Sequence, residues 1–248
     1  MTRRIKCRLV RRLPHTGVDM LTRRILTAGI VGFVLLAGPG TSSPLAQAQQ
    51  APPAGGRAAA PPPPDPKKPH KLELTTPTKA RYKVTEQLAG ISFPSDAVGT
   101  TEAITGAIII NPDGTIGPES KISVDLKTLT SDQSLRDGYI QQRTLETEKF
   151  PTLVIVPKRA VGLPAPLPAG QQAQAGFQLI VDMTLHGVTK ETTWNVVATF
   201  GNTSVGGRAT TTVQFADFNM TKPSLARLLS VDDKIQLEIE FRCTRTVM

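Results

Sequence analysis

The sequence of 248 residues contains very few of the side chains that most catalytic and metal-binding sites need. It has only two cysteines, Cys7 and Cys243, and three histidines, His15, His70 and His186. Cys7 and His15 lie in an N-terminal leader, and His70 lies in a proline-rich stretch. A folded part with one histidine and one cysteine excludes most His/Cys metal sites, any internal disulfide and any site that requires two histidines.

The formal net charge of +9 is concentrated in the leader. Residues 1–48 carry eight basic side chains and one acidic side chain, Asp19, whereas the rest of the chain carries 21 basic and 19 acidic side chains. The remainder is therefore close to neutral, which removes the main support for a phosphate-binding surface. We expect no nucleic-acid partner.

An export signal peptide is predicted at residues 1–48. Residues 25–37 form a predominantly apolar run after two arginines, and residues 46–48 (Ala-Gln-Ala) form a small-residue cleavage site. The alternative is an uncleaved membrane anchor, but this run is short for a bilayer span. We expect an exported protein of the periplasm, the cell envelope or the extracellular space, translated from Met1 or from Met20.

A linker is predicted to follow the leader. Residues 49–79 are rich in glutamine, alanine and proline, with four consecutive prolines at 61–64. Such a composition cannot bury a core and favours extended polyproline conformations. We expect a disordered spacer that holds one folded domain, residues 80–243, away from the membrane or wall.

The rest of the chain alternates apolar and polar residues with a period of two, which is typical of antiparallel strands with one apolar face. Eight strands are predicted, at residues 81–88, 98–110, 115–127, 152–159, 174–186, 190–200, 204–216 and 233–243. The alternation breaks at 131–148, where a short helix is expected to turn Leu135, Tyr139 and Ile140 inward. A second short helix is predicted within 218–229.

Long antiparallel strands must protect their edges from further pairing. A closed barrel does so, and eight strands leave room inside for one slim ligand. A two-sheet sandwich with a filled core is the alternative. The domain has only ten aromatic side chains, the chain's eleven less Phe33, which favours a lumen lined by aliphatic groups. We therefore predict an all-β, eight-stranded antiparallel barrel.

Five short motifs occur in the order and spacing of one known family, across about residues 80–243. They are Arg136-Asp-Gly-Tyr-Ile140, Thr144–Pro151, Leu185–Lys190, Asp217–Met220 and Val231–Ile239. Together they resemble the YceI-like family. The resemblance implies a lipocalin-like barrel that in some members holds a polyisoprenoid chain, and many members are exported. The sequence departs from the family pattern at Tyr139, where histidine is usual, and at Asn219, where glycine is usual.

The apolar strand faces form the candidate ligand-binding surface. Its residues are Phe177, Leu179, Val181, Met183, Leu185, Trp194, Val196, Ile235 and Leu237. Burying one five-carbon isoprene unit is worth about 4 kcal/mol, at about 0.8 kcal/mol per carbon. Because association costs about 4–15 kcal/mol, such a lumen should select chains of three or more units.

Polar residues near the strand ends are candidate contacts for the head of such a ligand. Arg136 and Asp137 either form a structural ion pair or, through Arg136 with Arg143, meet a polar lipid end at the barrel mouth. Tyr139 also belongs to this candidate site. His186 ends a strand, and we expect it to bond turn backbone rather than to act in catalysis.

These features predict an exported, non-enzymatic binding protein that holds a polyisoprenoid lipid or isoprenoid quinone in its lumen. We expect no cofactor and no metal. We do expect the protein to associate with the envelope or with a membrane surface. One alternative is an interaction module with a filled core. The other is a hydrolase or isomerase acting on a prenyl lipid, although the sequence has no nucleophile elbow, phosphate loop or metal-ligand spacing.

Overall fold

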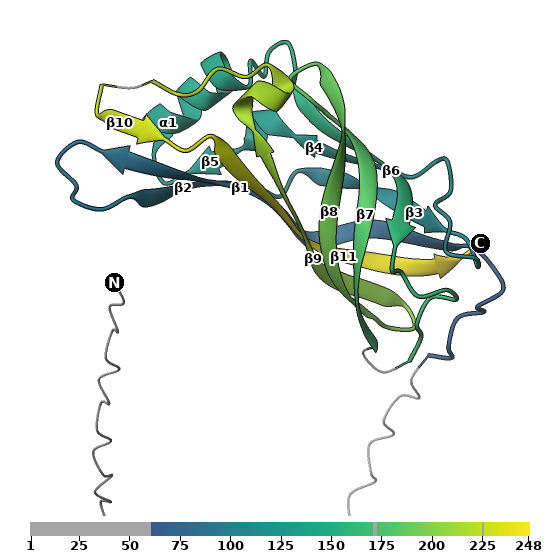
Figure 1. The fold of residues 1–248 in the computed structure, drawn as a ribbon. Coiled ribbons are helices and arrows are strands. Elements are labelled where there is room, and N and C mark those ends of the chain that lie inside the picture. The colour runs from purple at the N-terminus through teal and green to yellow at the C-terminus, as the bar shows by residue number, and fades with distance from the viewer. Residues whose placement is uncertain (1–60, 171–172, 225) are drawn as a thin grey trace, which may run out of the picture. The chain divides into compact units, whose positions relative to one another are not determined.

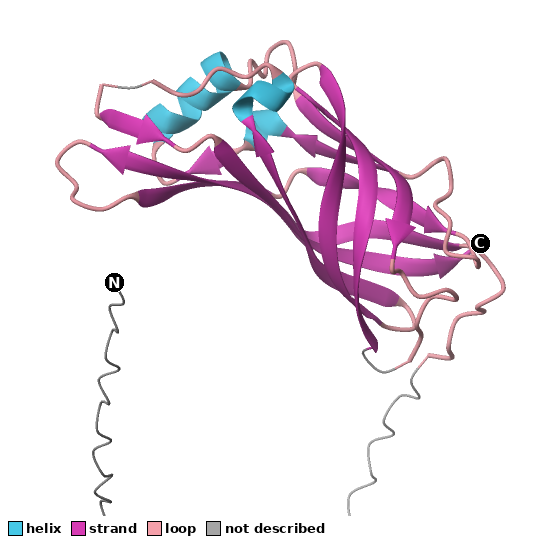
Figure 2. Ribbon diagram, in the orientation of Figure 1, coloured by secondary structure: helices cyan, strands magenta, loops and turns pink. Residues whose placement is uncertain are grey.

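The structure is a computed structural model that describes residues 61–170, 173–224 and 226–248, most of which lie in β-strands (Figure 2). The strands are β1 (His70–Leu88), β2 (Ser95–Thr101), β3 (Ile104–Ile110), β4 (Lys121–Asp125), β5 (Thr130–Ser131), β6 (Thr152–Val161), β7 (Ala173–Leu185), β8 (Val188–Phe200), β9 (Ser204–Gln214), β10 (Leu228–Val231) and β11 (Lys234–Val247). The helical turns are η1 (Leu126–Thr128), α1 (Ser134–Tyr139), η2 (Ile140–Thr144) and η3 (Phe215–Phe218). The predicted signal peptide and residues 49–60 of the predicted linker lie outside the described residues.

Eight of the described strands close into an antiparallel barrel. Their order around it is β1, β3, β4, β6, β7, β8, β9 and β11, and β11 pairs with β1 to complete the ring. That closing pair runs from His70 opposite Val247 to Lys83 opposite Gln236, with one register shift between Thr75 and Lys79. The predicted all-β barrel is therefore confirmed, and the sandwich alternative is wrong.

Three short strands extend the sheet at one end of the barrel. β2 pairs with the second half of β1, β5 pairs with β2, and β10 pairs with Glu86–Leu88 of β1. Figure 1 shows the β1–β2 hairpin, β10 and α1 together at this end. These elements surround the mouth of the lumen described below.

The first strand is longer than predicted. β1 begins at His70 and not at residue 81, so the predicted linker boundary at residue 79 is wrong. Its first six residues pair with β11, and four of them also pair with β3. Partners distant in sequence thus order a segment whose proline-rich surroundings indicated a spacer.

Two predictions about helices are wrong. Leu135 points into solvent because its α1 turn directs Arg136 and Tyr139 toward the barrel instead. No helix occurs in the described residues of 218–229 beyond the end of η3 at Phe218, and the chain forms β10 there. Pro223 lacks the N–H that a helix would require at that point.

Asn219 shows why glycine is usual at this position of the motif. It ends η3 in the left-handed region, with a φ of 53°, and its N–H bonds to carbonyl groups of the turn. Asparagine is one of the few residues other than glycine that adopt this conformation readily. The substitution therefore keeps the turn that places the buried Phe215 and Phe218.

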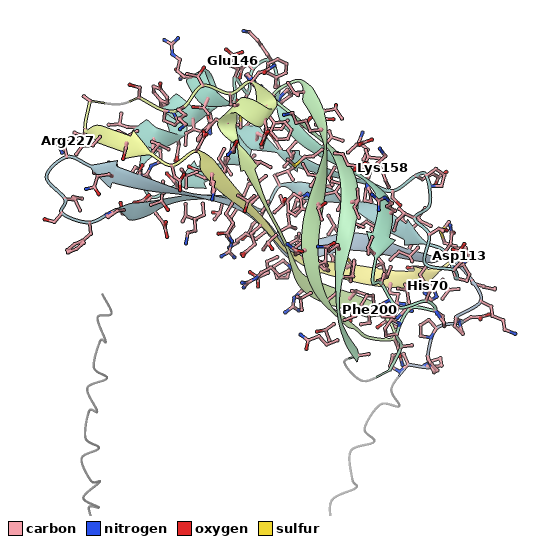
Figure 3. The ribbon with its side chains drawn as sticks, viewed as in Figure 1. His70, Asp113, Glu146, Lys158, Phe200 and Arg227 are labelled. Atoms are coloured by element: carbon pink, nitrogen blue, oxygen red, sulfur yellow. The ribbon has the colours of Figure 1, made fainter. Side chains whose placement is uncertain are left out.

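The end of the barrel opposite α1 is closed by a buried arginine. Arg245 Nε donates to His70 Nδ1 at 3.1 Å, and its Nη1 donates to the carbonyl oxygens of Pro168 at 2.6 Å and Gly201 at 3.1 Å. His70 Nε2 donates in turn to the carbonyl oxygen of Asp65 at 3.1 Å. This network joins β1 and β11 to two loops, and Figure 3 places His70 at the end opposite Arg227.

The His70 contacts predict acid-sensitive stability. Burial, and secondarily the charge of Arg245, lower the pKa of His70 below its ordinary value of 6.5, although Asp65 acts in the opposite direction. The folded chain then binds fewer protons than the unfolded chain, so this stabilisation is complete above pH 6.5 and is lost as the pH falls from there through the folded-state pKa. In urea titrations between about pH 8 and about pH 5, His70→Gln should reduce the acid-induced loss of unfolding free energy. An unchanged pH slope would contradict this.

Two neighbouring glycines of β9 should respond differently to alanine. A Cβ at Gly207 would overlap the carbonyl oxygen of Val197 and lie 2.8 Å from Ala198 Cα, whereas a Cβ at Gly206 would find its nearest neighbour at 3.6 Å. We expect Gly207→Ala to lower the unfolding free energy by about 1–3 kcal/mol, as overpacking does. Gly206→Ala is the control and should cost less than about 0.5 kcal/mol in the same denaturant titration. Equal losses of unfolding free energy for the two variants would contradict the close approach of β8 to Gly207.

Candidate ligand-binding lumen

The barrel interior contains two cavities arranged along its length. Measured for the centres of a water-sized sphere, the mouth cavity has a volume of about 120 Å³ and the deep cavity about 80 Å³. Ile239 of β11 lines both cavities, so its side chain lies between them.

The mouth cavity opens beside α1. Its half-buried lining residues include Tyr139 and Ile140 from the helical segment, and Pro223, Leu228 and Val231 from the segment that contains β10. The interior wall is fully buried and is formed by Val124, Leu145, Leu185, Trp194, Val213, Phe215 and Ile235, among others. The cavity therefore leads from a partly solvated rim into an apolar interior.

The deep cavity is entirely apolar. Its lining contains only aliphatic and aromatic side chains and one thiol: Leu72, Leu74, Ala107, Ile108, Ile110, Ile116, Ile122, Leu163, Phe177, Leu179, Val196, Ala198, Phe200, Val205, Ala209, Ile239, Phe241 and Cys243. Burial raises the pKa of Cys243 to about 12, so its thiol stays protonated and unreactive at neutral pH. Such a lining suits a hydrocarbon chain.

Polar groups are confined to the mouth cavity. Arg136 Nη2 donates to Glu86 Oε1 at 2.7 Å, and both side chains line the cavity. Arg136 also pairs with Asp132. Tyr82 lines the same cavity, where burial raises its pKa to about 12, so its phenol is neutral and can act as a donor. The lumen is thus polar toward α1 and apolar toward the closed end.

The two residues at the start of the helix do not pair with each other. Asp137 accepts hydrogen bonds from the backbone N–H and the hydroxyl of Ser131, at 2.9 and 2.6 Å, and so fixes the chain before α1. Arg136 uses Glu86 and Asp132 instead. An ion pair does tie the helix to the barrel, but the carboxylate that pairs with Arg136 belongs to Glu86 of β1. Sequence analysis missed this pair because Glu86 lies 50 residues from Arg136 in the chain.

The other predicted site residues divide between the two cavities. Tyr139, Leu185, Trp194, Ile235 and Leu237 join Arg136 in the mouth cavity, and Phe177, Leu179 and Val196 line the deep cavity. Val181 and Met183 are fully buried among the packed apolar side chains of the core and line neither the mouth cavity nor the deep cavity. Period-two alternation identifies the inward face of a strand, but it cannot distinguish lumen from packed wall.

His186 lies outside both linings. Its Nδ1 donates to the carbonyl oxygen of Phe218 at 3.1 Å, and its ring contacts Phe150 edge-on with centroids 4.8 Å apart. Its Nε2 lies 3.7 Å from Glu146 Oε2. The expected bond to turn backbone is therefore present, and it links the β7–β8 turn to η3.

Two polar atoms in the wall of the mouth cavity have neither a hydrogen-bond partner nor an ion-pair partner within the described residues. They are Trp194 Nε1 and Thr144 Oγ1, and both residues are buried. A buried donor without a partner costs about 1–3 kcal/mol, which a bound acceptor would recover. Trp194 is also the only tryptophan in the chain, so it can report directly on this cavity.

Within residues 61–248, the described side chains include no group of three or more His, Cys, Asp or Glu arranged to hold a metal ion. None of the described helices is long and apolar enough to cross a membrane.

A family model described as the YceI-like domain matches residues 75–243. Among solved structures, the chain resembles a polyisoprenoid-binding domain from Saccharophagus degradans implicated in plant cell wall breakdown, with 14% identity, a TM-score of 0.54, and 71% of this chain and 98% of that one covered. It also resembles BcnA of Burkholderia cenocepacia, with 12% identity, a TM-score of 0.51, and 66% and 95% covered. No curated protein matches the chain. At these identities, the likeness to the solved structures shows the shared fold.

Proposed function

Because this chain belongs to the YceI-like domain family, we propose that it is a non-enzymatic carrier that holds one polyisoprenoid lipid or isoprenoid quinone in its barrel. The observation that carries the proposal is the polarity of the lumen. Its deep cavity is lined only by apolar groups, whereas ionic and phenolic groups are confined to the mouth. A prenyl tail fits the first environment and an oxygenated head fits the second.

The ligand enters tail first in this proposal. The tail occupies the space around Ile239 and beyond, toward the end that Arg245 and His70 close. The head remains near Arg136 and Tyr82, with Trp194 Nε1 available to donate to a carbonyl or hydroxyl oxygen. A quinone supplies such an acceptor directly, and a lipid alcohol or phosphate supplies one as well.

Both alternative functions have less support. An interaction module with a filled core would not need the two cavities inside the barrel. A hydrolase or isomerase would need a nucleophile or base facing the mouth cavity. The two carboxylates there are paired with cations, Glu86 with Arg136 and Glu238 with Arg81 and Arg208. The domain's second histidine, His70, lies at the opposite end in the Arg245 network.

The predicted leader indicates where in the cell the carrier would act. A signal peptide at residues 1–48 would deliver the barrel to the periplasm, the envelope or the extracellular space. A prenyl lipid is nearly insoluble in those aqueous spaces, so a carrier that shields its chain would allow storage or transfer between membranes.

Trp194 fluorescence tests this function. Delipidated protein is titrated with prenyl quinones of increasing chain length, because a quinone bound beside the indole quenches its emission. We expect saturable, one-to-one quenching, with at least about a tenfold gain in affinity for each added isoprene unit until the lumen is filled. The matching quinone without a prenyl chain is the control. Quenching that is linear in concentration and independent of chain length would overturn the proposal.

A further inference from the structure

The end of the barrel that carries the lumen mouth also carries the most exposed apolar side chains. Leu135 of α1 is 86% exposed, Phe93 in the β1–β2 loop 79% and Leu229 of β10 68%, and these are the highest values among the large apolar residues described. Ile91, also in the β1–β2 loop, is 50% exposed. We call these four residues the apolar tips.

The apolar tips belong to the same elements that form the mouth. In β10, Leu228 lines the mouth cavity while the next residue, Leu229, faces solvent. In α1, Arg136 lines the cavity while Leu135 faces solvent. The β1–β2 loop adjoins β10, because Ala89 N–H donates to the carbonyl oxygen of Arg227 at 2.8 Å. The elements that carry the tips, the β1–β2 loop, β10 and α1, thus lie together at the end that contains the lumen mouth (Figure 1).

Acidic and basic side chains both surround the tips, and Arg227 is a cation among them whose charge a lipid phosphate would neutralise. Asp96 pairs with Lys83 at 2.7 Å, and Asp132 pairs with Arg136. Arg227, beside Leu229, is exposed and has no carboxylate partner in the described part of the chain, and Figure 3 places it at the outer limit of this end. Asp232, which follows β10, accepts a hydrogen bond from the backbone N–H of Lys234 and lines a small surface pocket together with Pro94 of the β1–β2 loop.

We propose that the apolar tips insert into the surface of a phospholipid bilayer, with Arg227 at the level of the lipid phosphates, so that the lumen mouth faces the membrane. Exposed aromatic and aliphatic side chains flanked by a cation form the usual arrangement of an interfacial anchor. The proposal rests on the carrier function, because a docked mouth lets a prenyl chain pass from bilayer to lumen without crossing water.

A tryptophan placed at the tips tests insertion directly. The variants are Phe93→Trp and, as a matched control, Val197→Trp, each in a Trp194→Phe background; Val197 is exposed on β8 of the barrel wall. Full-length protein is mixed with phosphatidylcholine–phosphatidylglycerol vesicles that contain brominated lipids. An indole about 5–10 Å into the interface is blue-shifted and quenched by the bromines. We expect the blue shift and the quenching for the indole at position 93 and not for the indole at position 197. Membrane binding through the leader alone would not bury the indole at position 93, so it would not produce this difference.

Other occupants give other results, and each overturns the proposal. A blue shift at position 93 that grows with protein concentration without vesicles would indicate a second copy of the chain. An indole at position 93 that stays accessible to aqueous iodide in the presence of vesicles would indicate that the tips remain in water or bind a protein instead.

Transfer kinetics separate this inference from the carrier function. With Trp194 as the reporter, Phe93→Ser combined with Leu229→Ser should slow prenyl quinone uptake from vesicles at least about tenfold. The same variant should bind the quinone from detergent micelles within about twofold of the parent. Slow uptake by parent and variant from both sources would indicate that the carrier function fails, whereas equal, rapid uptake from vesicles would indicate that only the docking surface is wrong.

Discussion

Replacing Ile239 with phenylalanine is expected to lower affinity for a long prenyl chain about 100-fold, because this residue lines both cavities and a larger ring there obstructs the passage between them. A chain that loses access to the deep cavity leaves about two isoprene units in water, each worth at least about tenfold in affinity. Ligands short enough to fit the mouth cavity should lose less than about threefold. The measurement is Trp194 quenching by a series of quinones of different chain lengths.

The matched variant for this experiment is Ile239→Ala, which widens the passage. It should retain or increase affinity for long chains, although removing the buried side chain costs about 2–5 kcal/mol of stability. Thermal denaturation of both variants, compared with the parent, identifies any loss of binding that follows from unfolding. Equal losses for short and long ligands in a folded Ile239→Phe protein would contradict a continuous lumen.

Replacing Arg245 with methionine should lower the unfolding free energy by about 3–5 kcal/mol. One buried acceptor, His70 Nδ1, and two half-buried acceptors, the carbonyl oxygens of Pro168 and Gly201, lose their donor in this variant. Each unsatisfied buried acceptor costs about 1–3 kcal/mol, and water entry at the barrel end offsets part of the total. Urea denaturation at neutral pH gives the value.

Arg242 provides the control on the same strand. Its side chain is exposed, and Arg242→Met should change the unfolding free energy by no more than about 0.5 kcal/mol. A cost below about 1 kcal/mol for Arg245→Met would show that the arginine network does not hold the barrel end closed.

Local patterning in the sequence was enough to predict antiparallel strands, and the resemblance to the YceI-like family favoured their closure into a barrel. The alternation of Phe177 to Leu185 in β7 and of Ile235 to Phe241 in β11 reflects the pleat of each strand, which depends on neighbouring residues alone. The first half of β1 could not be predicted in this way. Its ordered state depends on pairing with β11, more than 160 residues away in sequence.

The candidate site was predicted in part for the same reason. Trp194 and Leu237 were expected to face inward and do line the lumen, and Arg136 lies at its mouth. Glu86, Leu228 and the His70–Arg245 network were missed, because each acquires its role from partners brought together only by closure of the barrel. Leu135 was assigned to the wrong face because helical periodicity over six residues does not fix the rotation of the helix.

Native mass spectrometry of the protein purified from the cells that naturally produce it tests the central claim most directly. The account predicts one added mass per chain, released by organic extraction as a prenyl lipid or quinone. It also predicts that Ile239→Phe carries less of the long-chain species than the parent does. Protein that is recovered free of lipid, and that takes up no prenyl compound after delipidation, would contradict the account.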